Sequence, residues 1–310
     1  MNKRLSLLLL VVIVSVSVTY SQKNNIVLWG SGGYSNFIKN APTLNSIGNT
    51  IGDALSGAQI GDPNKLTSVG SIGGEFGVGY ELSIKKFLLQ TGVGYQYLNA
   101  SLQLQDSLHN LMLLDSEGDI FRGYFLFSEN KDSYRVGSVT IPLLLGAKFN
   151  NIYFLAGVKM GINISTTSTH QSKIRSYADY AQFINIFENM PNHGLHTWNE
   201  RNNHSMKFNP SYMASVEFGY LFKEKPSKGL SVNYRMAAFA NYGLNNIKTT
   251  STVNRELILS KSPITYQPYL NSVLLSQEYK NTVFNPLFAG MKFTVVFGLP
   301  NPRKCICEDY

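Results

Sequence analysis

The chain has 310 residues, a formal net charge of +8 and 44% hydrophobic residues, a length that fits one large β domain or two ordinary domains. Its two cysteines exclude a disulfide framework, and its basic residues, dispersed among Asn, Ser and Tyr, exclude the clustered stripe of a nucleic-acid-binding protein. Past the amino terminus the apolar residues occur in short alternating pieces, which excludes a helical membrane protein.

The amino terminus has the pattern of a cleaved export signal. Lys3 and Arg4 precede an apolar run over residues 5–18, and Thr19 and Ser21 are the small residues that a signal peptidase requires. The run is shorter than the roughly 18 residues of a membrane-spanning helix. We therefore expect cleavage after Ser21, so that residues 1–21 form a signal peptide. The charge of +8 then falls by two, to +6, when Lys3 and Arg4 leave.

Period-two alternation recurs through the rest of the chain, with apolar side chains on one face and small or polar side chains on the other. This alternation is typical of half-buried strands. Most of the segments approach the roughly 9 to 11 residues that a tilted strand needs to cross a bilayer. The eight predicted strands lie at about residues 26–30, 72–84, 89–97, 139–149, 150–165, 212–222, 230–242 and 287–297.

The predicted connections alternate between short and long. Short turns fall at 85–86, 150–151 and 223–229, and long polar connections at about 34–70, 103–134, 166–206 and 243–283. Four such connections are hard to reconcile with a compact soluble domain, whereas outer-membrane barrels have short periplasmic turns and longer extracellular loops. We therefore expect an all-β fold over residues 22–298, an eight-stranded antiparallel up-and-down transmembrane β-barrel in a bacterial outer membrane, in contact with lipid.

The charged residues on the strands indicate which face points inward. If the register of a strand shifted by one residue, its basic side chains would face the bilayer, and each would cost about 2 to 4 kcal/mol of folding free energy at mid-depth. The predicted polar network of the lumen consists of Glu75, Glu81, Lys148, Lys159, Glu217, Arg235 and Lys292. The alternative is a secreted barrel of lipocalin type, with its apolar face turned inward around a ligand.

Eight strands enclose a lumen that side chains can fill, so we expect these charges to pair in a polar core without an open channel. A narrow polar path for ions is the alternative interpretation. The glycines of "GSIGGEFGVGYE" lack the Gly-Lys-Ser/Thr of a phosphate loop and fit inward-facing positions, where small groups fill a tapering interior.

Residue patterns for catalysis or metal binding are scarce. The segment "HGLHTWNERNNH" holds His193, His196 and His204, but it lacks the His-Glu-x-x-His spacing of a metalloprotease, and with His170 these histidines suit a solvated loop. We expect no catalytic residues, metal or cofactor. The aromatic residues from Tyr177 to Phe187 recur at helical spacing, which predicts a short helix over the mouth of the barrel.

The segment "VGSVTIPLLLGAKFNNIYFLAGVKMGINIS", residues 136–165, resembles the PorT-like family of small outer-membrane β-barrels, in which Ile-Pro-Leu-Leu leads through a tight turn into a Gly-x-Lys-x-Gly strand. Residues 73–97 are similar to an early hairpin of that family. The resemblance implies an outer-membrane location and, for some members, a part in protein secretion; it implies no catalytic residues. Within the shared motif, Pro142 predicts a tolerated bulge.

Residues 299–310 follow the last predicted strand and are expected to lie in the periplasm. Cys305 and Cys307 suggest contact with a periplasmic or envelope partner, or disulfide exchange there; a disordered end is the other interpretation. The expected function is a non-enzymatic, structural or interaction role in the cell envelope, with a secretion assembly as one setting. A passive transporter for small solutes and a barrel enzyme that acts on lipid are the alternatives.

Overall fold

A computed structural model describes residues 22–40, 66–115, 117–188, 190, 195–223, 231–249, 257–260, 267–276 and 283–299. These residues form antiparallel strands, together with a 3-10 turn, η5 (Val273–Leu275). The prediction of an all-β antiparallel chain is confirmed. In the described part of the chain, no helix has the length and apolar character to cross a membrane.

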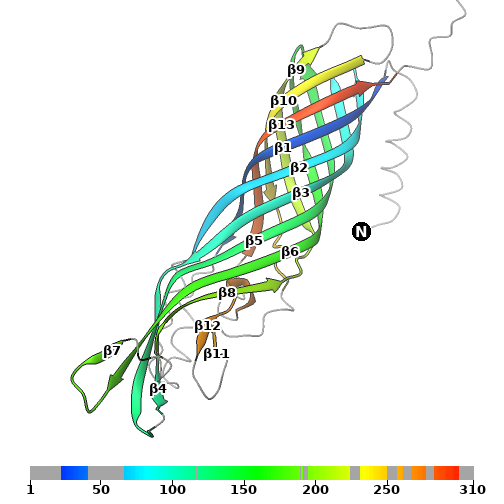
Figure 1. Cartoon of the computed structure of the whole chain (residues 1–310). Coiled ribbons are helices and arrows are strands. Elements are labelled where there is room, and N and C mark those ends of the chain that lie inside the picture. The colour runs from blue at the N-terminus through cyan, green and yellow to red at the C-terminus, as the bar shows by residue number, and fades with distance from the viewer. Residues whose placement is uncertain are drawn as a thin grey trace, which may run out of the picture.

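Eight strands pair in a closed ring, in the order β1-β2-β3-β5-β6-β9-β10-β13 (Figure 1). The ring closes where β13 returns to β1, with Ile26 opposite Phe297 and Gly33 opposite Gly290. The ring strands are β1 (Gln22–Asn40), β2 (Leu66–Ile84), β3 (Phe87–Leu104), β5 (Ile120–Phe149), β6 (Ile152–Tyr180), β9 (Ser211–Lys223), β10 (Ser231–Gly243) and β13 (Val283–Gly298). Each of the eight predicted segments overlaps one of these strands, although residues 150–151 form the turn before β6 and residue 230 lies outside the described residues.

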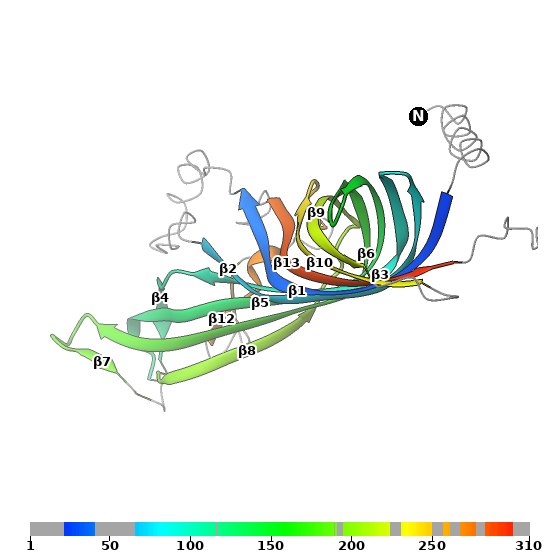
Figure 2. The same ribbon diagram turned by 90° about the horizontal axis from the view of Figure 1, so that it is seen from above.

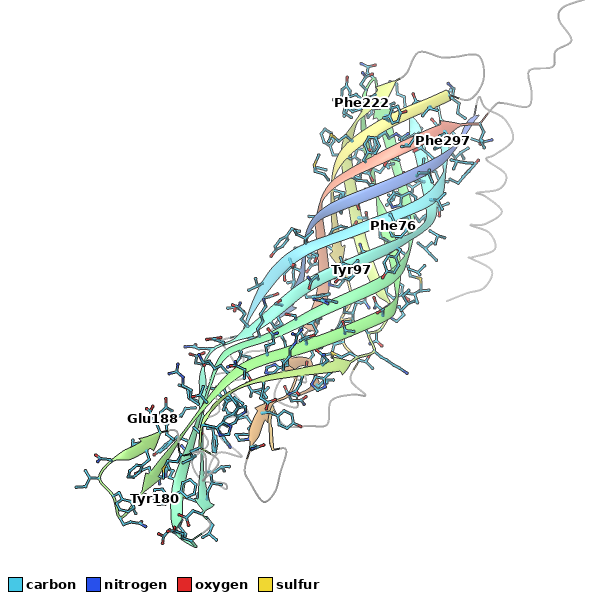
Figure 3. All side chains as sticks on the ribbon, viewed as in Figure 1. Phe76, Tyr97, Tyr180, Glu188, Phe222 and Phe297 are labelled. Carbon is cyan, nitrogen blue, oxygen red and sulfur yellow. The ribbon has the colours of Figure 1, made fainter. Side chains whose placement is uncertain are left out.

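The outer surface of the ring is apolar. Ile72, Phe76 and Val158 are exposed by 79%, 65% and 53%, values that a water-facing surface would not favour for large apolar side chains. Phe76 and Tyr97 lie on the outside of the ring, as Figure 3 shows. On β6 this apolar row runs from Ile152 to Ile164 and on β5 from Val139 to Phe149. We call it the apolar belt.

Trp29 faces the interior of the ring, so the first strand alternates like the others. Its side chain is 5% exposed and lies over glycines of β2 and β3. A Cβ at Gly77 or Gly92 would overlap the indole ring. The glycines predicted to fill a narrowing interior therefore make room for one large aromatic side chain.

Two of the predicted turns are two-residue hairpins. Lys85 joins β2 to β3 with φ 52°, and Asn150 joins β5 to β6 with φ 53°. Positive φ matches the twist of the flanking strands, and asparagine adopts it at low cost. The third predicted turn lies almost entirely outside the described residues.

The prediction that residues 103–134 and 166–206 form long loops is wrong. β5 and β6 continue past the ring and remain paired as far as Phe121 opposite Tyr180. Beside them lie β4 (Ser107–Leu114), β7 (Ile186–Glu188) and β8 (Thr197–Ser205). We call this sheet the extension. Figures 1 and 2 show it projecting from one end of the ring, and Figure 3 places Tyr180 and Glu188 at its far end.

The predicted helix from Tyr177 to Phe187 is also wrong, because β6 runs through Tyr180 and β7 follows at residues 186–188. In β6 the backbone N–H and C=O groups form hydrogen bonds with β5, and this non-local pairing outweighs the preference for a helix that the spacing of the aromatic residues indicates. The aromatic residues form a cluster instead, with ring centroids of Phe183 and Phe187 5.7 Å apart.

The predicted bulge at Pro142 is absent, both where β5 pairs with β6 and where it pairs with β3. Pro142 lies opposite Lys159 in an uninterrupted part of the β5–β6 ladder, and the register of β5 against β3 is the same on either side of it. The β5–β6 bulges lie at Gly137/Ser138 and Ser128/Lys131. Beyond a bulge, the strand that carries the extra residue has the opposite set of residues facing inward. A period-two count along the sequence therefore does not detect that β5 and β6 continue.

Candidate functional site

The interior of the ring holds three carboxylate–cation pairs that join strands across the interior. Lys159 Nζ on β6 lies 2.8 Å from Glu75 Oε2 on β2, and Lys292 Nζ on β13 lies 2.7 Å from Glu217 Oε2 on β9. Arg235 on β10 binds Glu81 on β2 through both terminal nitrogens, 2.7 Å for Nη2 to Oε1.

These charges are almost completely buried, and further polar groups donate hydrogen bonds to the three carboxylates. Tyr153 donates to Glu217 Oε1 at 2.5 Å, Thr140 to Glu75 Oε1 at 3.2 Å, and Asn25 to Glu81 Oε1 at 3.1 Å. Such additional hydrogen bonds are what makes a buried ion pair tolerable, because desolvation of two charges otherwise exceeds their attraction.

Aromatic faces complete the surroundings of two cations. The guanidinium of Arg235 lies 5.0 Å from the ring centre of Tyr153, and Lys292 Nζ lies 5.3 Å from that of Trp29. Lys148 lies nearer the short turns, is half-buried and donates to Ser83 Oγ at 2.6 Å. All seven residues of the predicted network therefore have their side chains at inward-facing positions.

The space left inside this polar layer is small. Between the Glu75–Lys159 and Glu217–Lys292 pairs lies a cavity of ≈ 10 Å³, also lined by Trp29. A cavity of about that size holds roughly one water molecule.

The end of the ring away from the short turns is filled by an apolar cluster that no local sequence pattern predicts. It combines side chains of the ring strands, including Phe37 and Phe284, whose rings stack at 4.4 Å, with Val273 and Leu274 of η5. Residues 257–260 and 267–276 carry β11 (Ile258–Ser260), β12 (Pro268–Leu270) and η5. Their apolar side chains cover the interior at this end, which we call the mouth.

Asp132 anchors this covering segment. Its carboxylate accepts hydrogen bonds from the Val273 backbone N–H at 2.6 Å, Ser272 Oγ at 3.0 Å and Tyr134 OH at 2.6 Å. His170 Nδ1 lies 2.6 Å from its other oxygen. Burial, together with the neighbouring carboxylate, raises the pKa of Tyr134 well above its ordinary value, so the phenol remains a donor.

The expectation that the histidines are solvated is wrong for His170, which is fully buried. His196 and His204 are half-buried, and the His196 ring lies 4.8 Å from that of Trp198. His193 lies outside the described residues, as do Cys305 and Cys307. Among the residues described, no three or more His, Cys, Asp or Glu side chains are grouped to hold a metal ion.

The contacts of Asp132 and His170 could not be found from the sequence, because both residues lie in segments predicted to be loops. The available signal was the alternation of Leu98, Ala100 and Leu102, which continues β3 past its predicted end and places it against β5. No family model matches this chain, and no curated protein matches it either.

Proposed function

We propose that this chain is a non-enzymatic outer-membrane β-barrel with a structural or interaction role in the cell envelope. The observation that carries the proposal is the combination of an apolar outer belt with an interior of paired charges. Hydrocarbon is the solvent in which such a belt is stable, and a closed ring leaves no sheet edge unpaired within it.

The hydrogen-bond network of the interior favours a structural role over a conducting one. A solute path needs water along the axis, whereas the polar layer leaves a cavity of ≈ 10 Å³ and the mouth is packed with apolar side chains. The same packing leaves little room for a lipid substrate beside the buried Asp132 and His170. We therefore rank a passive transporter and a lipid-acting enzyme below the structural role.

The extension suits contact with other molecules. Its far end exposes Met112, Leu114 and Ile120 from the β4–β5 hairpin, together with Phe183 and Ile184 from the β6–β7 turn. Exposed apolar groups gathered in one place are typical of interaction sites. On the resemblance to PorT-like proteins, we propose an envelope or secretion assembly as the setting.

The membrane location is tested by heat-modifiable migration of the membrane-extracted protein, combined with protease treatment of intact cells. A barrel with the extension outside should migrate faster before boiling and be cut in the extension, not in the ring. Cleavage throughout the ring would contradict the proposal.

Measurements of conductance in planar bilayers distinguish the structural role from the passive transporter. The structural role predicts no steady channels, and lipid analysis of a deletion strain should show an unchanged lipid profile. Steady single-channel currents from the folded protein would favour the transporter, and a missing lipid product would favour the enzyme.

A further inference from the structure

One border of the extension is a strand edge without charge. β4, with the sequence "SLHNLMLL", pairs with β5, and among the strands that the structure describes it has no partner on its other side. Its residues include no Lys, Arg, Asp, Glu or Pro. Burial lowers the pKa of His109, so the imidazole is uncharged at neutral pH. The edge of β4 therefore presents backbone N–H and C=O groups with no charged side chain on the strand.

The opposite border of the extension differs in this respect. Figure 2 shows β4 and β8 at the two borders of the sheet, and β8 carries Glu200, Arg201 and three asparagines. Charged side chains on an edge strand discourage pairing with another chain, whereas an exposed apolar edge favours it. On β4 the outward side chains Leu108, Met112 and Leu114 are exposed. The contrast between the two borders points to β4 as the edge that accepts a further strand.

A strand added to β4 has to match an edge that is apolar on both faces. The inner face adds Leu111 and Leu113, which lie opposite Gly123 and Phe121 of β5. A second copy of β4 offers the same uncharged, two-sided apolar chemistry. Directly opposite residues of an antiparallel pair share a face of the sheet.

Two copies of β4 satisfy this condition when they are paired about Leu111. Leu108 then lies opposite Leu114 on the outer face, and Leu111 lies opposite its own copy on the inner face. Pairs of apolar side chains opposite one another stabilise a sheet, and like charges opposite one another destabilise it. This register sets no charged side chain of either strand against another, so β4 is complementary to itself.

We propose that β4 pairs antiparallel with β4 of a second copy of this chain, so that two extensions join edge to edge in one sheet. The inference rests on the proposed membrane location and names the partner of the proposed interaction role.

The direction of the strands decides where the two rings lie. β4 lies lengthwise beside β5, which runs from the far end of the extension into the ring (Figure 1). Antiparallel pairing reverses this direction between the copies. Because barrel strands tilt by only about 40° from the barrel axis, the reversal also turns the second ring over, and the rings stand at opposite ends of the joined sheet. Two copies paired in this way cannot share one membrane, so the pair joins two facing membranes.

The test places the full mature chain in lipid nanodiscs with one ring in each disc, so that two copies can meet only between discs. Heat-modifiable migration reports insertion and folding. The affinity of tagged discs for untagged, fluorescent discs is then measured. The test variant is L108K/M112K, at two exposed positions of β4, with M112K alone as a milder second variant. The matched control, I184K/I186K, adds the same charge at two exposed apolar positions at or next to β7, on the other side of the sheet from β4.

Wild-type discs should associate in pairs, and electron microscopy should show the two discs at opposite ends of a joined sheet. L108K/M112K should weaken association by about ten-fold or more, because lysines replace apolar cross-strand pairs and bring like charges together. M112K should weaken it in the same direction, and I184K/I186K should associate as the wild type does.

Three outcomes would overturn the inference while leaving insertion intact. They are wild-type discs that stay separate, association of L108K/M112K equal to that of the wild type, and equal losses in L108K/M112K and I184K/I186K, which would indicate general contact of apolar surfaces. A wild-type chain that fails to insert would overturn the membrane location and the inference together.

Discussion

Lys159 and Glu75 meet across the interior of the ring, with 2.8 Å between Nζ and Oε2, although 84 residues separate them in the chain. The pair links β6 to β2, which lie three strands apart around the closed sheet by way of β3 and β5. It therefore holds the cross-section of the ring in a way that neighbouring-strand hydrogen bonds do not.

Replacing Lys159 by methionine should destabilise the fold strongly, because Glu75 would remain buried without a counter-charge. The expected loss is about 3 to 5 kcal/mol of unfolding free energy, measured by urea titration of vesicle-embedded protein. The double variant E75Q/K159M should recover part of this loss. K173M, which removes a more exposed cation 3.9 Å from Glu129, should cost at most about 1 kcal/mol. A single variant as stable as the wild type would show that the pair contributes nothing.

Gly77 is expected to tolerate no larger side chain. A valine there would overlap the indole of Trp29, and overpacking of this kind costs about 1 to 3 kcal/mol. The fraction of protein that folds, read from heat-modifiable migration, should fall. Gly30→Val is the matched control, because a Cβ at Gly30 meets nothing within 4 Å. Equal folding yields for the two variants would contradict the packing of Trp29 on these glycines.

Val158 lies midway along the belt on β6, and an arginine there should be excluded from hydrocarbon. If lipid covers the belt, V158R should lose about 2 to 4 kcal/mol on folding into vesicles. T167R, at an exposed position beyond Ile164, should lose less than about 1 kcal/mol. Comparable stability of the two variants would instead support a water-soluble ring.

Asp132 holds the covering segment at the mouth through Ser272 Oγ and the Val273 backbone N–H, so D132N should loosen it. An amide oxygen in the place of Oδ2 carries no full charge, which weakens the three hydrogen bonds that Oδ2 accepts, by about 1 to 3 kcal/mol in total. Limited proteolysis of the folded protein should then cut within residues 267–276. D106N, at an exposed position, is the control. Protection equal to that of the wild type would show that apolar packing alone holds the segment.

Lys248 predicts a pH dependence of stability. Burial lowers its pKa from 10.5 to about 8. The unfolded chain therefore binds more protons than the folded chain between these values, and stability should rise as the pH increases from about 8 to about 10.5, by at most roughly 3 kcal/mol. K248M should flatten this rise in urea titrations at both pH values. An identical rise in wild type and variant would assign it to other groups.

The sequence by itself determined where the ring strands lie and which side of each strand is apolar. Period-two alternation is a local property, and it places Phe76 on the opposite face from Glu75 whatever strands lie beside them. The same count places Lys159 and Arg235 on the polar faces of their strands, and the structure shows that these faces point inward.

Only the tertiary structure decided which of these charges form pairs. Glu81 binds Arg235 because the order and stagger of the strands bring β2 and β10, which are far apart in sequence, to the same level of the interior. It also decided that β5 and β6 continue as the extension, since the bulges at Gly137/Ser138 and Ser128/Lys131 break the period on which strand prediction depends. The apolar packing of the mouth and the contacts of Asp132 also depend on the tertiary structure. Asp132 contacts Ser272 and Val273, which lie more than a hundred residues further along the chain, and a local sequence pattern cannot predict contacts at that separation.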